Sequence, residues 1–125
     1  MPKSLPLFLF LTLFEACDPV HQIRLENATK APIEVWMGGD KIFGQDSLEI
    51  VNHRGRKVKR AQLAPGALLN IGTVIARYTP QLNNLEVDFL EIRTASGDTI
   101  TLAGRDTIFS RVQKFGRLDW RLRVE

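Results

Sequence analysis

Residues 118–125 read LDWRLRVE, and this stretch decides the fold class. Leu118, Trp120, Leu122 and Val124 alternate strictly with four charged side chains. Because successive side chains along a strand point to opposite faces of a sheet, the pattern predicts a strand with one buried and one solvated face. The other apolar segments of the chain are then expected to supply the strands that complete the same core.

Five further segments carry the composition or the alternation of strands. They are residues 20–27 (VHQIRLEN), 33–37 (IEVWM), 68–78 (LLNIGTVIARY), 85–94 (LEVDFLEIRT) and 99–104 (TITLAG). Turn residues separate these segments, so we expect one hairpin from the first two and a second hairpin from the last two. The alternation slips by one residue at Leu90, which predicts a bulge or a strand that is buried on both faces.

Residues 41–60 fit two kinds of element. A helix with Asp46 as its cap and Gly55 as its end is one interpretation. The other is a strand over residues 48–52 that turns at Arg54 and Gly55 into a second strand at Val58. The β-branched residues in EIV favour the strands.

Residues 106–116, DTIFSRVQKFG, carry the signals of one short helix near residues 107–115. Asp106 is a cap, the apolar residues have near-helical spacing, and Gly116 is a stop. Since helix signals are otherwise few, the chain predicts an all-β fold. We expect a small antiparallel β-sandwich of the immunoglobulin-like or transthyretin-like kind. With 125 residues and a net charge of +3, the chain has room for one domain, which we assign to residues 20–125.

The chain begins MPKSLPLFLFLTLFEAC. One cation, Lys3, precedes the uncharged run Leu5–Phe14, which is the layout of an export signal. The run is too short to cross a bilayer, because a spanning helix needs roughly 20 apolar residues. It ends in LFEAC, where small Ala16 precedes Cys17, the only cysteine of the chain.

This ending resembles the lipobox of bacterial lipoproteins. The resemblance implies a signal peptide over residues 1–16, a lipid on Cys17, and a short tether over residues 17–19. It also implies a mature protein anchored in the bacterial cell envelope, and Asp18 favours retention in the inner membrane. The alternative is that residues 1–16 fold into the domain core and that Cys17 is an inert buried thiol.

Catalytic motifs are absent from the sequence. The two histidines, His21 and His53, stand in no nucleophile or zinc-ligand pattern. Carboxylates such as Glu34, Asp88 and Glu91 are expected on the ordinary solvent face of strands. We therefore expect no enzymatic activity, no cofactor and no metal. An envelope hydrolase or enzyme inhibitor remains the alternative, and a cluster of inward-facing carboxylates or a contact between His53 and an aspartate in a cleft would favour it.

One run of the sequence concentrates positive charge. It comprises Arg54, Arg56, Lys57, Lys59 and Arg60. On a projecting hairpin these side chains would attract an anionic partner, either an envelope protein or an anionic envelope polymer. They would equally serve as a solvated loop that keeps a sheet edge unpaired. The run lacks the aromatic residues that nucleic-acid sites use for stacking, so no nucleic acid is expected unless residues 1–16 prove not to be a signal.

Trp36 falls on the polar parity of its predicted strand, beside Glu34. An exposed tryptophan would be an interface anchor. Cover by the segment 41–60 is the interpretation that we favour. The sequence therefore predicts a lipid-anchored, non-catalytic binding or adaptor module, with Cys17 as the lipid site and the basic run as the contact surface.

Overall fold

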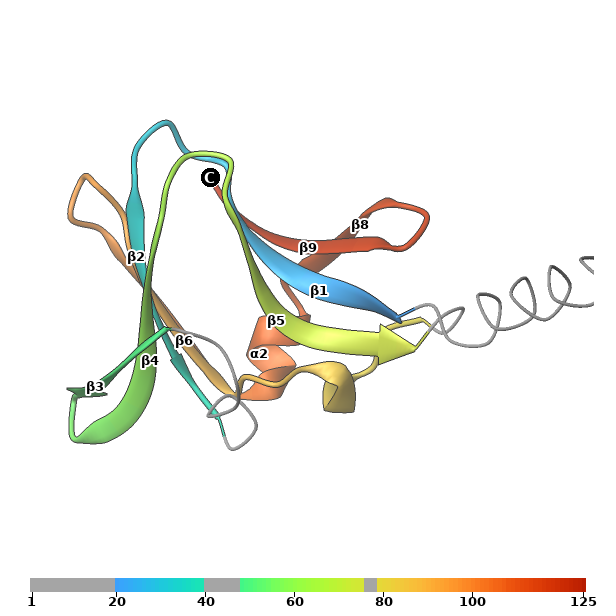
Figure 1. Cartoon of the computed structure of the whole chain (residues 1–125), viewed down its shortest axis with the longest axis horizontal. Coiled ribbons are helices and arrows are strands. Elements are labelled where there is room, and N and C mark those ends of the chain that lie inside the picture. The colour runs from blue at the N-terminus through green and yellow to red at the C-terminus, as the bar shows by residue number, and fades with distance from the viewer. Residues whose placement is uncertain (1–19, 40–47, 76–78) are drawn as a thin grey trace, which may run out of the picture.

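The structure is a computed structural model, and it describes residues 20–39, 48–75 and 79–125. The described strands form two packed sheets (Figure 1). The predicted all-β sandwich is therefore confirmed. Cys17 and the rest of residues 1–19 lie outside the described part of the chain, so the predicted signal peptide and lipid site stay predictions.

Four strands form sheet A, in the spatial order β5 (Leu68–Ile75), β1 (Val20–Asn27), β9 (Asp119–Val124) and β8 (Val112–Gly116). Five strands form sheet B, in the order β3 (Glu49–His53), β4 (Arg56–Leu63), β2 (Ile33–Gly38), β6 (Phe89–Arg93) and β7 (Thr99–Ala103). The pair β1 and β9 is parallel, and every other described pair is antiparallel. The first and last described strands thus lie side by side in the middle of sheet A.

The core fills the space between the two sheets. Alternate residues of the strands supply it, as the period of two in a strand requires. Its fully or almost fully buried members include Ile23, Leu25, Ile33, Val35, Ile71, Leu85, Leu90, Ile92, Ile108, Leu122 and Val124. Leu122 and Val124 come from the alternating stretch at residues 118–125. The prediction that this stretch has one buried face is confirmed for β9.

The predicted hairpin of residues 20–27 and 33–37 is wrong. β1 pairs with β5 and β9 in sheet A, while β2 pairs with β4 and β6 in sheet B. The reason is Asn27, which is fully buried. Its side-chain amide donates to the carbonyls of Ala31 and Leu63 at 2.9 and 3.0 Å, and it stabilises a crossing from one sheet to the other.

The slip of alternation at Leu90 marks a second crossing. Leu85 forms an isolated bridge with Gly72 of β5, in sheet A, whereas β6 begins at Phe89 in sheet B. Leu85, Val87 and Leu90 are all buried, because the chain passes through the core region between the sheets. The strand predicted over 85–94 is therefore shorter than expected. The hairpin that it forms with β7 is confirmed.

The remaining elements test the predictions for residues 107–115 and for residues 41–60. The predicted helix near residues 107–115 is only one turn, α2 (Arg105–Phe109), and residues 112–116 form β8 instead. A short 3-10 turn, η1 (Leu82–Asn84), lies near β5. In the segment 41–60, the strand interpretation is confirmed from Glu49 onward, and residues 40–47 lie outside the described part. The described residues include no helix long and apolar enough to cross a bilayer.

Candidate functional site

The candidate site lies on the outer face of sheet B. The tip of the hairpin that β3 and β4 form covers it. The hairpin turns at Arg54 and Gly55, both of which have positive φ values, 54° and 77°. Glycine adopts this conformation without strain, as the tight turn of a two-residue hairpin requires. The sequence HRGR therefore places His53 and Arg54 at the tip of a hairpin, as its turn chemistry predicted.

Trp36 is covered by this hairpin. Its register partners are Arg60 on β4 and Glu91 on β6, so it belongs to the outer face of sheet B. Nevertheless only 6% of Trp36 is exposed, because the His53 ring stacks on it with centroids 4.6 Å apart and planes 11° from parallel. The guanidinium of Arg93 lies 5.1 Å from the ring centroid as well. The predicted cover over Trp36 is thus confirmed.

Glu91 is the central charged group of the site. It is fully buried, although it lies on the outer face of the sheet. His53 Nε2 lies 2.7 Å from Glu91 Oε2, within hydrogen-bond distance. Arg54 Nε lies 3.0 Å from Glu91 Oε1, an ion pair whose geometry falls short of an aligned hydrogen bond. Two residues of the hairpin tip thus approach one carboxylate beneath them.

The other cations of the basic run also meet carboxylates. Arg56 contacts Asp88 at 2.6 Å, and its guanidinium lies 5.3 Å from the centre of the Phe89 ring. Arg60 contacts Glu34 at 3.1 Å and Glu49 at 3.5 Å. The hydrogen bond to Glu34 and the charge of that carboxylate raise the pKa of Arg60 above its ordinary value.

The five cations do not share one surface. Lys59 pairs in register with Met37 of the core and is almost fully buried, so its side chain belongs to the inner side of sheet B. Lys57 is exposed on β4. Arg54, Arg56 and Arg60 lie at the outer side, each beside a carboxylate of the same chain. The local field on this face is therefore one of mixed sign.

Glu34, Asp88 and Glu91 were expected on an ordinary solvent face. Glu91 is fully buried instead. The alternation of residues along its strand does not predict this burial. Its burial arises because two residues at the tip of the β3–β4 hairpin, His53 and Arg54, lie over it on the outer face of the sheet. The turn signal at Arg54 and Gly55 predicted the hairpin, but the direction in which the hairpin bends has no local sequence signal.

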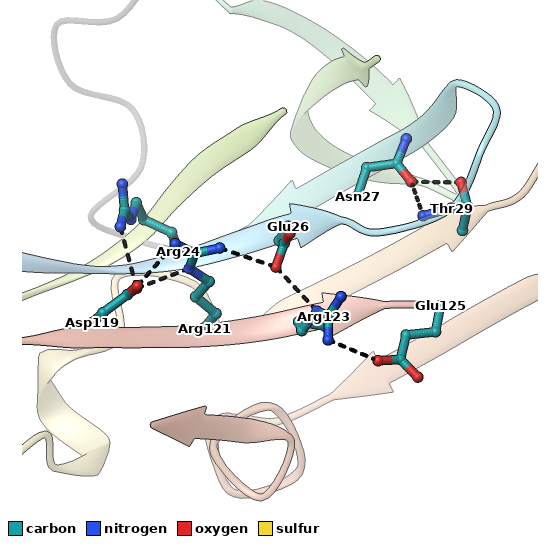
Figure 2. Close-up of polar contacts among 8 residues, drawn as sticks. All are labelled: Arg24, Glu26, Asn27, Thr29, Asp119, Arg121, Arg123 and Glu125. Carbon is teal, nitrogen blue, oxygen red and sulfur yellow. Dashed lines mark hydrogen bonds and ion pairs between the residues drawn. The ribbon is translucent and has the colours of Figure 1, made fainter. Parts of the chain in front are cut away.

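A second polar cluster covers the outer face of sheet A (Figure 2). Asp119 contacts Arg24 at 3.2 Å and Arg121 at 2.8 Å, and Glu26 contacts Arg121 at 3.3 Å and Arg123 at 3.1 Å. The hydrogen bond from Arg121, assisted by Arg24, lowers the pKa of the Asp119 carboxyl against the opposing effect of burial. The network joins the parallel strands β1 and β9 across their outer face.

The described residues hold no group of three or more His, Cys, Asp or Glu side chains suited to a metal ion. Comparison of the chain with protein-family models, with curated proteins and with solved structures finds no match in any of the three.

Proposed function

We propose that the protein is a lipid-anchored binding or adaptor module of a bacterial cell envelope that has no turnover of its own. One observation carries the proposal. The first described strand of the sandwich already contains Val20, the third residue after the cysteine of the lipobox-like ending. A tether of that length would hold the domain directly at the membrane surface.

The charge pattern of the hairpin favours a protein as the partner. An anionic polymer is attracted by an excess of one sign of charge. Here Arg54, Arg56 and Arg60 already lie beside carboxylates. A surface of alternating sign suits a partner protein that carries its own complementary pattern, because charge complementarity gives specificity more than raw affinity.

The anchor is tested first, by expressing the full chain in a bacterium and comparing wild type with Cys17→Ser. We expect wild type to lose residues 1–16, to gain the mass of acyl chains and to sediment with membranes. The Cys17→Ser variant should stay unacylated. If both proteins remain soluble at full length, the lipid-anchor proposal fails.

The binding surface is tested by photo-crosslinking in the same cells. A photo-reactive residue replaces Lys57, which is exposed on the hairpin strand β4, and a matched control replaces Lys30, which is exposed in the turn between β1 and β2. We expect a discrete crosslinked protein from position 57 and none from position 30. Equal crosslinking from both positions would contradict a partner site on the hairpin.

A small envelope hydrolase is the second candidate function. The contact of 2.7 Å between His53 and Glu91 favours it, since a buried carboxylate can orient a histidine that acts as a general base. Activated-ester hydrolysis by wild type and by His53→Gln tests this candidate. General-base catalysis typically contributes about 10²–10⁴-fold, so a hydrolase would lose activity on that scale. Equal background rates would leave the pair with a structural role.

A further inference from the structure

Three large apolar side chains are exposed at one end of sheet A. Val20 begins β1, Ile75 ends β5 as its register partner, and each is 56% exposed. Leu118, in the turn between β8 and β9, is 47% exposed. Because β1 and β9 are parallel, the beginnings of both strands lie at the same end of the sheet, and Figure 1 shows the β8–β9 turn there too.

Two of these side chains, Val20 and Leu118, border a common depression, which Arg24, Gln22 and His21 also line. The imidazole of His21 is buried, and neither of its ring nitrogens has a hydrogen-bond partner among the described residues. Buried polar groups without partners are uncommon in folded proteins. A buried imidazole thus borders this depression without a hydrogen-bond partner in the part of the chain that the structure describes.

The backbone at Leu118 is unusual as well. Its φ is +131°, a conformation that residues with a Cβ rarely adopt and that glycine adopts at lower free energy. A large apolar side chain is thus held at an exposed, strained turn. Nearly half of the surface of Leu118 is exposed. Strain of this kind concentrates at functional positions.

We infer that this end of the sandwich, formed by Val20, Ile75, Leu118 and the neighbouring Arg117, docks on the surface of the bilayer that holds Cys17. The inference rests on the proposed lipid anchor. Val20 is the third residue after Cys17, and three extended residues span at most about 11 Å. The polar layer on each side of a bilayer is about 5–8 Å thick. The start of β1 therefore reaches no farther than the vicinity of the lipid head groups.

The side chains of this end suit a head-group layer. Apolar side chains enter the boundary between head groups and acyl chains, while cations stay with the phosphates. Arg117 is exposed next to Leu118 in the turn. The nearest carboxylate in sequence, Asp119, is already bonded to Arg24 and Arg121, so it adds little repulsion toward an anionic lipid.

Depth-dependent fluorescence quenching tests the docking. In the full, lipidated chain, Leu118→Cys supplies a thiol for a bimane label, and Ala95→Cys in the exposed β6–β7 turn supplies a matched control. Figure 1 shows that turn far from the start of β1. Each protein is reconstituted in vesicles of phosphatidylethanolamine and phosphatidylglycerol that contain a doxyl-labelled lipid. We expect several-fold stronger quenching at position 118 than at position 95.

A second variant separates docking from mere tether length. Ile75→Glu, introduced beside Leu118→Cys, should lower the quenching several-fold if the apolar end enters the bilayer. Equal quenching at positions 118 and 95, or no effect of Ile75→Glu, overturns the inference while the anchor stands. The mass of the purified protein is measured before reconstitution, to show whether Cys17 carries acyl chains. Absence of acyl mass shows that the anchor proposal has failed, and the docking inference falls with it.

Discussion

The outer faces of the two sheets carry the same kinds of charged side chain in different surroundings. On sheet A, guanidinium and carboxylate groups alternate in a partly exposed network across β1 and β9 (Figure 2). On sheet B, the hairpin of β3 and β4 folds over Glu91, which is fully buried between His53 and Arg54. Exposed ion pairs contribute little to stability, whereas breaking a buried pair is costly. Burial, rather than composition, decides what each cluster contributes.

The largest expected difference between the faces concerns their aromatic residues. Trp36→Ala should lower the free energy of unfolding by about 3–5 kcal/mol, because it removes a buried ring under the hairpin. Phe115→Ala on sheet A should cost at most about 1 kcal/mol, because Phe115 is 43% exposed and contacts Arg121 and Arg123 only as a cation–π partner. Urea denaturation of both variants measures the difference. Similar losses would show that the hairpin does not bury Trp36 in solution.

The hydrogen bond to Glu91 is expected to matter more than any single bond on sheet A. His53→Phe keeps a ring against Trp36 but leaves Glu91 Oε2 without this donor, so we expect a loss of about 1–3 kcal/mol. Arg24→Ala, which removes a partly exposed partner of Asp119, is the control and should cost about 0.2–1 kcal/mol. Thermal and urea denaturation of the two variants give the comparison. A smaller loss for His53→Phe than for Arg24→Ala would contradict it.

The sheet A network should show its contribution through pH. The pKa of Asp119 is lowered in the folded state, chiefly by the hydrogen bond from Arg121. Its stabilisation is therefore fully present above the unfolded pKa of about 3.9 and is lost as the pH falls through the lower folded-state pKa. We expect Asp119→Asn to cost up to about 1 kcal/mol at pH 7 and progressively less below pH 4. A stability difference that grows on acidification would contradict this sign.

The smallest expected effect is the coupling between Arg123 and the exposed Glu125 in the same network, whose side chains contact at 3.3 Å. A double-mutant cycle with Arg123→Gln and Glu125→Gln should give a coupling of about 0.2–0.5 kcal/mol at low salt. In 1 M NaCl, where the screening length is about 3 Å, this coupling should approach zero. The His53→Phe loss on sheet B should change much less with salt, because Glu91 is buried. An equal salt dependence at both sites would remove the distinction between the faces.

Local pattern predicted the strands well where it had a clear period. The alternation in residues 118–125 and the turn at Arg54 and Gly55 both lead to elements that the structure contains. The hairpin predicted at Asn27 was wrong. Asparagine is common in hairpin turns, but Asn27 is buried and stabilises a crossing between the sheets. Local pattern failed again after α2, where near-helical spacing of apolar residues continues into β8. At Asn27 a hydrogen bond to the distant carbonyl of Leu63 outweighed the local preference, and after α2 the antiparallel pairing of β8 with β9 did so.

The sequence indicated only part of the candidate site. The basic run and Trp36 stood out by composition, but their partners Glu34, Asp88 and Glu91 looked like ordinary surface carboxylates. Pairing of those carboxylates with the run depends on strand order in sheet B, because β2 lies between β4 and β6, which are far apart in the sequence. No local rule contains that order, since it results from packing two sheets around one core.

The sequence by itself determined the all-β class and the hairpin turn at residues 54–55, because alternation and turn chemistry are local properties of the chain. It also supplied the lipobox-like ending at Cys17, on which the anchor proposal depends. The tertiary structure alone decided the parallel pairing of β1 with β9, the burial of Glu91 and the meeting of Val20, Ile75 and Leu118 at one end. These features arise from contacts between residues far apart in the chain, and their free energy is defined only after the sheets have packed.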